Sequence, residues 1–523
     1  MKRKENLRIF VALITIGVLF ITGFNSVIAL EDTEKTITVG TFQAPATLDP
    51  ANHRQIMAQN VIRMMGEGLM DDLPDTSYIY SVAESITELD PLSYEIKIRE
   101  GITFHNGDPV TADDVIFTWE RLTQEGAMEG ATSPRRPLLP VDSVEKVDDY
   151  TVIARIKTYS SILQRRWFHW EVMPKKYFEE VGIDGYLEHP IGCGPFKYVS
   201  GDTNTELVLE RYDNYYGGPD EVPGVVDQVP AVDRVILKYI TEPTTRVAAL
   251  LAGEVDIIQD VPVDMLPLLK SNPDIEIASI ASNSMTCLAL NVNRPPFDDK
   301  RVRQAVGCAI NYEMLVNQMF SGEAKILGGI PFLEFYSTHP AYHDFDHIKS
   351  IKYDPEKAKS LLEEAGATGA TIVIDTWPEN SEPAQAIAQM LNEVGLNASV
   401  RIWEAGVISA EVQKGERLAY LVSIGNGLRT PDWIVRFTSN KPTNSNYFKY
   451  TNHDFDDRMN RAGAMRYSTE QIELFDEAFK IFMDDLPIIT IYAKNVIDAH
   501  RSNIRNYYAY ANRWTKLHRV DIE

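Results

Sequence analysis

Residues 371–403 contain the pattern that most restricts the possible folds of this chain. A strand-like run from Thr371 to Thr376 is followed by a helix-like segment, Pro383 to Val394, which ends at Gly395. A second strand-like run then extends from Ala398 to Trp403. Strand, helix and strand at this spacing are typical of a βαβ unit, whose two strands lie parallel in one sheet. We therefore expect an α/β domain in this part of the chain.

Length and charge limit the class of protein. A chain of 523 residues is too long for a single hydrophobic core, so we expect at least two domains. The hydrophobic content of 44% and the charged content of 24% are ordinary for a soluble globular protein. The formal net charge of −24 argues against nucleic acid as a partner and against a sustained grip on anionic lipid headgroups.

The first residues have the layout of an export signal. Lys2, Arg3 and Lys4 precede an uncharged apolar run from Ile9 to Phe24, and small or modest side chains follow up to Ala29. This order of basic, apolar and small residues is typical of a signal peptide, although an uncleaved anchor is the alternative. We expect an exported protein that touches the membrane only through such an anchor.

The cysteine content predicts no disulfide framework. Only Cys193, Cys287 and Cys308 occur, and no two of them form a CxxC pair for zinc or redox chemistry. We expect each of them to be a small buried side chain.

Several segments have a specific order of strand, turn and helix. An alternating strand at 94–99 precedes the turn 104–109, in which Asn-Gly predicts a positive φ, and Thr111 begins a helix. Further segments read HPIGCGPFKY at 189–198, GEVDI at 253–257 and RPPFDDKRVRQA at 294–305. We interpret Gly192 and Gly194 as positions with backbone conformations that other residue types do not adopt. At 452–459, NHDFDDRM predicts the start of another helix.

Together these segments resemble the extracytoplasmic solute-binding proteins of ABC importers, in the peptide/nickel-binding family, family 5. The resemblance implies an α/β, two-lobed periplasmic-binding-protein fold of type II (Venus flytrap), with an extra subdomain inserted in the first lobe. It implies this division: 1–29 signal peptide or anchor, 30–60 first lobe, 61–165 inserted subdomain, 166–260 first lobe again, 261–487 second α/β lobe, and 488–523 return to the first lobe.

The same resemblance implies a function in transport. The protein is expected to capture a peptide-like solute in the cleft between its lobes and to deliver it to an ABC permease with its ATPase subunits, as a monomer at the periplasmic or extracellular face of the membrane. No enzymatic activity and no cofactor are expected, and no GxSxG, HExxH or Walker A motif appears. An oligosaccharide is the alternative ligand, a metal chelate is a third, and a secreted hydrolase such as a glycosidase is the alternative of another class.

Candidate ligand contacts follow from the resemblance and from the places where strands end. They are Thr41, Phe42, Gln43, Asn283, Met285, Thr286, Trp377, Trp403, Asn426, Arg429, Asp432 and Trp433. In peptide-binding members an aspartate near the last of these positions pairs with the peptide amine, which makes Asp432 the candidate here. Core packing of the tryptophans, and a turn or helix-cap role for Asp432, are the alternative interpretations.

Overall fold

The structure is a computed structural model, and it describes residues 34–53, 55–72, 78–123, 141–157, 159, 171–217, 229–328, 350–404, 407–408, 411–412, 414–425, 438–439, 446, 449–466 and 468–523. The predicted signal peptide lies outside these residues. None of the helices in the described part combines the length and the hydrophobicity that crossing a bilayer requires.

The largest sheet has twelve strands in the described residues and consists of two half-sheets. The first half-sheet contains β8 (Phe196–Gly201), β9 (Glu206–Arg211), β10 (Arg234–Tyr239), β1 (Thr36–Thr41) and β11 (Ile257–Ile258). The second half-sheet contains β13 (Ser284–Leu290), β17 (Ala419–Gly425), β15 (Thr371–Thr376) and β16 (Asn397–Ile402). The strands β12 (Ile275–Ala281), β14 (Ala324–Ile326) and β18 (Ile488–Arg501) complete the sheet.

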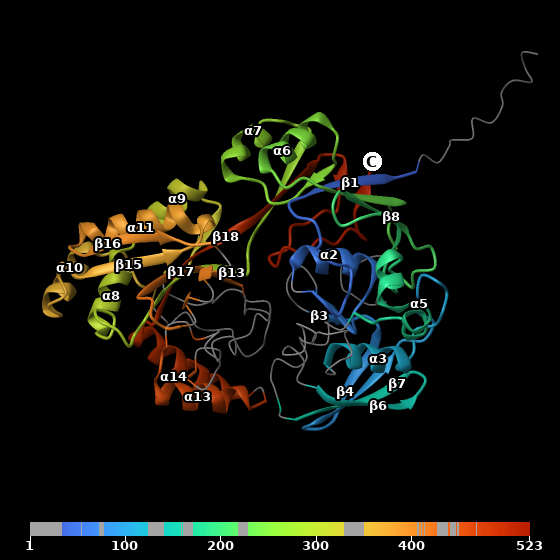
Figure 1. Ribbon diagram of the computed structural model, residues 1–523, viewed down its shortest axis with the longest axis horizontal. Helices are drawn as coiled ribbons and strands as arrows, with labels where there is room; N and C mark the ends of the chain where they lie inside the picture. Colours follow the sequence, from blue (N-terminus) through green and yellow to red (C-terminus); the bar gives the residue numbers. More distant parts are fainter. Residues whose placement is uncertain are drawn as a thin grey trace, which may run out of the picture. The chain divides into compact units, whose positions relative to one another are not determined.

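One strand, β18, belongs to both half-sheets. Its residues 488–492 pair with β13, and its residues 499–500 pair with β11. Between these two regions lie residues 493–498, which pair with the flanking strands β12 and β14. We call residues 493–497 the joining segment. Figure 1 shows β18 running on from the second half-sheet into the first.

The predicted βαβ unit is confirmed. Strands β15 and β16 pair in parallel, with Thr371 beside Asn397, and the helix α11 (Ser381–Glu393) connects them. Together with α8 (Lys300–Ala309), α9 (Tyr312–Phe320) and α10 (Pro355–Glu364), this helix covers one face of the second half-sheet in a single apolar core.

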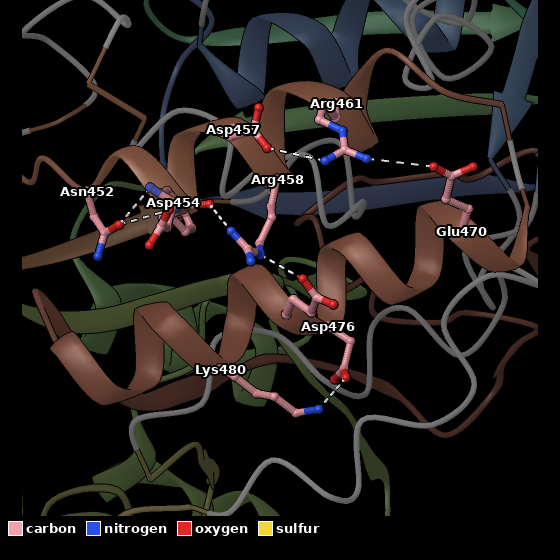
Figure 2. Close-up of polar contacts among 10 residues, drawn as sticks. Asn452, Asp454, Asp457, Arg458, Arg461, Glu470, Asp476 and Lys480 are labelled. Carbon is pink, nitrogen blue, oxygen red and sulfur yellow. Dashed lines mark hydrogen bonds and ion pairs between the residues drawn. The ribbon is translucent and has the colours of Figure 1, made fainter.

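The other face of the second half-sheet is covered by α13 (His453–Gly463) and α14 (Thr469–Asp485). The helix start predicted at Asn452 is confirmed, because the Asn452 side chain accepts hydrogen bonds from the backbone N–H groups of Asp454 and Phe455. Figure 2 shows the polar contacts on the exposed side of this helix pair, where Arg461 lies between Asp457 and Glu470. Such exposed pairs contribute little to stability.

The first half-sheet has its own covering layers. The helix α2 (Ile56–Met65) packs on β1, β8, β9 and β10. The helices α6 (Pro243–Ala252) and α7 (Leu266–Lys270), with the 3₁₀ turn η3 (Val263–Met265), form another core with β11 and β12. Residues 263–281, which the sequence division assigns to the second lobe, therefore pack beside the first half-sheet.

A second, four-stranded sheet lies within residues 83–156. Its strands, in spatial order, are β4 (Ala83–Asp90), β5 (Ser93–Ile98), β7 (Thr151–Ile156) and β6 (Val141–Asp148), and α3 (Ala112–Thr123) and α5 (Lys175–Glu188) pack in the same core. The small pairs β2 (Met70–Asp72) with β3 (Tyr78–Tyr80) and β19 (Ile504–Arg505) with β20 (Asp521–Ile522) complete the strands of the described residues.

Two local predictions in this part of the chain are confirmed. Gly107, in the turn between β5 and α3, has a φ of 87°. The three cysteines are free and buried.

Candidate functional site

The carboxyl ends of the parallel strands in each half-sheet, among them β1, β11, β15 and β17, lie on the side of the joining segment. In the first half-sheet, the chain leaves β11 and runs antiparallel to β18, so that the N–H of Val261 donates to the carbonyl of Ile497 at 2.8 Å. In the second, β17 ends at Gly425 beside Ser284, and the N–H of Ser282 donates to the carbonyl of Lys494 at 3.0 Å. Because ligands of open α/β sheets bind outside the carboxyl ends of strands, we take the region around the joining segment as the candidate site.

Three predicted contacts lie at the carboxyl end of β1. The Thr41 hydroxyl is buried and donates to the carbonyl oxygens of Gln43, at 3.2 Å, and Lys238, at 3.4 Å. The ring of Phe42 is half-buried in the core of the first half-sheet, and the guanidinium of Arg513 lies 5.8 Å from its centre. Gln43 is exposed. Thr41 therefore shapes the backbone of the loop, whereas Phe42 and Gln43 present surface.

Arg513 also forms an ion pair with Asp260, 3.3 Å from Nη2 to Oδ1. Asp260 follows β11, and its backbone has a φ of 55°. Arg513 therefore links the loop after β1, the loop after β11 and the C-terminal segment at this end of the first half-sheet.

Trp377 follows directly after β15 in the second half-sheet. Its ring is half-buried and meets the ring of Tyr420 edge to face, with 6.2 Å between the centres. The indole N–H is buried and has no hydrogen-bond partner among the described residues. A buried donor without a partner costs free energy, so this group is available to an acceptor that enters the site.

Asn283, Met285 and Thr286 lie at the start of β13, but they are not equivalent. The N–H of Asn283 donates to the carbonyl of Ala511 at 2.9 Å. Thr286 contacts the hydroxyl of Ser423 on β17 at 3.2 Å, and the amide of Asn380 donates to the same hydroxyl at 3.3 Å. The Met285 side chain points to the opposite face of the strand, where it has no exposed surface.

The side chain of Trp403 makes its contacts with other residues of the protein. Its indole N–H donates to Oδ1 of Asp375 at 2.7 Å, and its ring lies 5.3 Å from the guanidinium of Arg401 and 4.8 Å from that of Arg417. The remaining predicted contacts, Asn426, Arg429, Asp432 and Trp433, lie outside the described residues.

Sequence reasoning missed Lys494, which lies in the joining segment. Its side chain is half-buried, and Nζ lies 5.0 Å from the centre of the Phe320 ring. Burial lowers the pKa of Lys494, and the charges of Glu379, Arg513, Asp260 and Glu382 act on it from both half-sheets. A lysine directly after the strongly apolar run 486–493 was the signal that could have identified it.

A separate polar cavity of about 40 Å³ lies within the first half of the molecule, between α2, β2 and the C-terminal segment. There the carboxyl of Glu67 accepts hydrogen bonds from the hydroxyls of Ser81, Tyr215 and Tyr216. Burial raises the pKa of Glu67 and lowers that of His518 to about 3. The cavity is large enough to hold water, but it does not contact the joining segment.

Among the described residues, no three side chains of His, Cys, Asp or Glu are grouped so that they could hold a metal ion.

Solved structures share this fold. HbpA2 from Haemophilus parasuis aligns with a TM-score of 0.80 at 21% identity, over 93% of this chain and 100% of that one. DppA from Helicobacter pylori, in complex with the peptide STSA, aligns with a TM-score of 0.74 at 22% identity, over 95% and 100%. AppA from Bacillus subtilis, in complex with a nonapeptide, aligns with a TM-score of 0.71 at 22% identity, over 94% and 99%.

Sequence comparisons lead to the same class. The glutathione-binding protein GsiB of Escherichia coli O157:H7 is 27% identical over 91% of this chain and 92% of its own length, and GsiB of Pectobacterium atrosepticum is 26% identical over 88% and 89%. The fold, with strand ends of two half-sheets facing one connecting strand, is that of the periplasmic binding proteins. The profile of the bacterial extracellular solute-binding proteins, family 5 (middle region), matches residues 77–446, and the chain belongs to this family.

Proposed function

We propose that this protein captures a peptide-like solute beside the joining segment and delivers it to an ABC-type permease with its ATPase subunits. The observation that carries the proposal is that the strand ends of both half-sheets meet there, each with aromatic and charged side chains. A peptide has backbone amides, termini of both charges and apolar side chains, and this mixture of groups suits it.

The relatives support this class of ligand. GsiB proteins are named for glutathione, and the DppA and AppA structures hold peptides. Membership of family 5 supports action outside the cytoplasm without covalent chemistry. Of the predicted contacts, Phe42, Gln43, Trp377 and Thr286 have the most suitable positions, and we extend the proposal to Asn426, Arg429, Asp432 and Trp433.

The proposal is tested by ligand-induced stabilisation. Residues 30–523 are heated with pools of dipeptides to pentapeptides, and separately with pools of oligosaccharides, and bound species are identified by native mass spectrometry. A ligand at a hundredfold excess over its Kd stabilises the folded state by about 2.7 kcal/mol, which gives a measurable rise in melting temperature.

We expect the rise with peptides, and we expect the bound peptide to be recovered intact after long incubation. A rise with oligosaccharides alone contradicts the peptide proposal, and cleavage of the bound peptide contradicts the absence of catalysis.

A further inference from the structure

Lys494 occupies the position in the main sheet where the two half-sheets meet. Its backbone carbonyl accepts from Ser282 on the side of the second half-sheet, and three residues later Ile497 accepts from Val261 on the side of the first. Side chains alternate along a strand, so Lys494 shares its face of β18 with Tyr492, whose ring lies 4.7 Å from that of Phe320. The backbone of Lys494 therefore lies at the centre of the candidate site, and its side chain lies over the Phe320 ring.

The ammonium of Lys494 has a weak set of partners within the protein. The ammonium contacts the face of the Phe320 ring, and no carboxylate of the described residues lies within 4.0 Å of Nζ. Glu379, Asp260 and Glu382 act on it only at longer range. Arg513, a second cation that acts on Lys494, already has a carboxylate partner, Asp260.

This arrangement is incomplete in chemical terms. An ammonium has three N–H donors and no acceptor, and a cation–π contact satisfies its charge without accepting a conventional hydrogen bond. Burial of a cation without a close anion is unfavourable, and the lowered pKa of Lys494 reports this cost. A carboxylate that entered from the site would relieve it.

We propose that Lys494 binds a carboxylate group of the solute, and that the protein therefore selects solutes with a free carboxylate over their neutral counterparts. The inference rests on the proposed function, since it concerns the same site. The exposed acids Glu379, in the turn before α11, and Glu382, in the first turn of α11, supply negative charge for a cationic end of the same solute.

The test compares peptide acids with the matching peptide amides on four proteins by isothermal titration calorimetry. The proteins are the wild type, Lys494→Gln, Lys494→Arg and the control Lys325→Gln. Lys325 on β14 is also half-buried, but it pairs with Ala493 and therefore lies on the face of the sheet opposite to that of Lys494. The probes are tripeptides with a free carboxyl end, the same tripeptides with an amidated end, and neutral oligosaccharides, and melting temperatures report the folding of each variant.

We expect the wild type and Lys325→Gln to bind the acids about 10- to 100-fold more tightly than the amides, as a charge-assisted hydrogen bond requires. Lys494→Gln should lose this preference for acids. Lys494→Arg keeps the positive charge and should retain most of the preference, so it still tests the proposal if the Gln variant does not fold.

Two results overturn the role of Lys494 while the peptide function stands. One is equal binding of acids and amides by the wild type, and the other is an undiminished preference for acids in Lys494→Gln. Binding of neutral oligosaccharides alone overturns both proposals.

Discussion

The indole N–H of Trp403 donates a 2.7 Å hydrogen bond to Oδ1 of Asp375, whose side chain is only 1% exposed. The same oxygen accepts from Nε of Arg401, also at 2.7 Å. A buried carboxylate needs such donors, because desolvation of an unpaired charge is costly. Trp403 therefore stabilises the carboxyl end of β15, which lies directly before Trp377 in the chain.

Substitution of Trp403 separates a structural role from a ligand contact. We expect Trp403→Phe to lower the free energy of unfolding by about 1–3 kcal/mol, because Asp375 loses one of its donors. Peptide affinity, measured by calorimetry, should change by less than about threefold. If affinity collapses while stability is unchanged, Trp403 contacts the ligand directly, as the sequence suggested.

Trp377 should behave in the opposite way. We expect Trp377→Phe to weaken peptide binding about fivefold, the equivalent of one hydrogen bond of about 1 kcal/mol, because its unpaired indole N–H is lost. Trp119→Phe is the matched control, since Trp119 is also half-buried and its N–H also has no partner among the described residues. Equal affinities of Trp377→Phe and the wild type would place the Trp377 N–H outside the binding contact.

Asp498, also on β18, gives a prediction about pH. Burial raises its pKa to about 6 from an ordinary value of 3.8, although Tyr507 donates a hydrogen bond to it at 2.7 Å. Between these two values the folded state binds more protons than the unfolded state. The contribution of Asp498 to stability is therefore complete below about pH 3.8 and is lost as the pH rises through 6.

The measurement is urea unfolding at several pH values from 4.5 to 7.5. Over this range the free energy of unfolding of the wild type should fall by roughly 2 kcal/mol more than that of Asp498→Asn, because about 1.5 pH units of the titration lie between pH 4.5 and 6 and one unit corresponds to about 1.4 kcal/mol. The exposed Asp264→Asn should follow the wild type. Parallel pH profiles for wild type and Asp498→Asn would show that Asp498 titrates normally.

Gly192 gives a prediction about close packing. A Cβ at Gly192 would overlap the carbonyl oxygen of Met65, and a Cβ at Gly194 would lie 2.7 Å from the Met65 carbonyl carbon. We expect Gly192→Ala to lower the free energy of unfolding by several kcal/mol, within the range of about 1–5 kcal/mol known for severe core substitutions.

Gly463 supplies the control, because a Cβ there meets nothing within 4 Å. Gly463→Ala, near the end of α13, should be neutral or slightly stabilising. Thermal unfolding of both variants checks the contrast, and a Gly192→Ala protein as stable as the wild type would show that α2 moves aside at little cost.

These glycines show what sequence could and could not predict. The motif correctly marked Gly192 and Gly194 as special, but we attributed this to unusual φ angles, and neither has a positive φ. The cause is the approach of α2, whose C-terminal residue Met65 accepts a 2.8 Å hydrogen bond from the Gly194 N–H. A contact between residues more than a hundred positions apart leaves no local signal.

The same limit applies to β18 and to the site. The sequence division assigned 488–523 to the return to the first lobe, but the polar residues from Lys494 onward conceal that residues 488–501 form one continuous strand. These polar residues are tolerated in the strand because residues distant in the sequence form hydrogen bonds with them. Tyr507 donates to Asp498, and Glu323 accepts from Asn495. By contrast, the βαβ unit at 371–403 was predictable because its periodicity is local.

Strand alternation explains one further difference. Met285 and Thr286 were both proposed as contacts, yet neighbouring residues of a strand point to opposite faces, so that only Thr286 meets Ser423. Which of the two would face the site depends on the register with β17, and the sequence does not contain that information.

The double membership of β18 also has a consequence for biosynthesis. Until residues 488–501 leave the ribosome, β13 and β11 each have an open edge where β18 will later pair. Neither half-sheet can be completed by the first 487 residues, and unpaired strand edges are prone to aggregate. The nascent chain should therefore keep both half-sheets incomplete until residues 488–501 have been added.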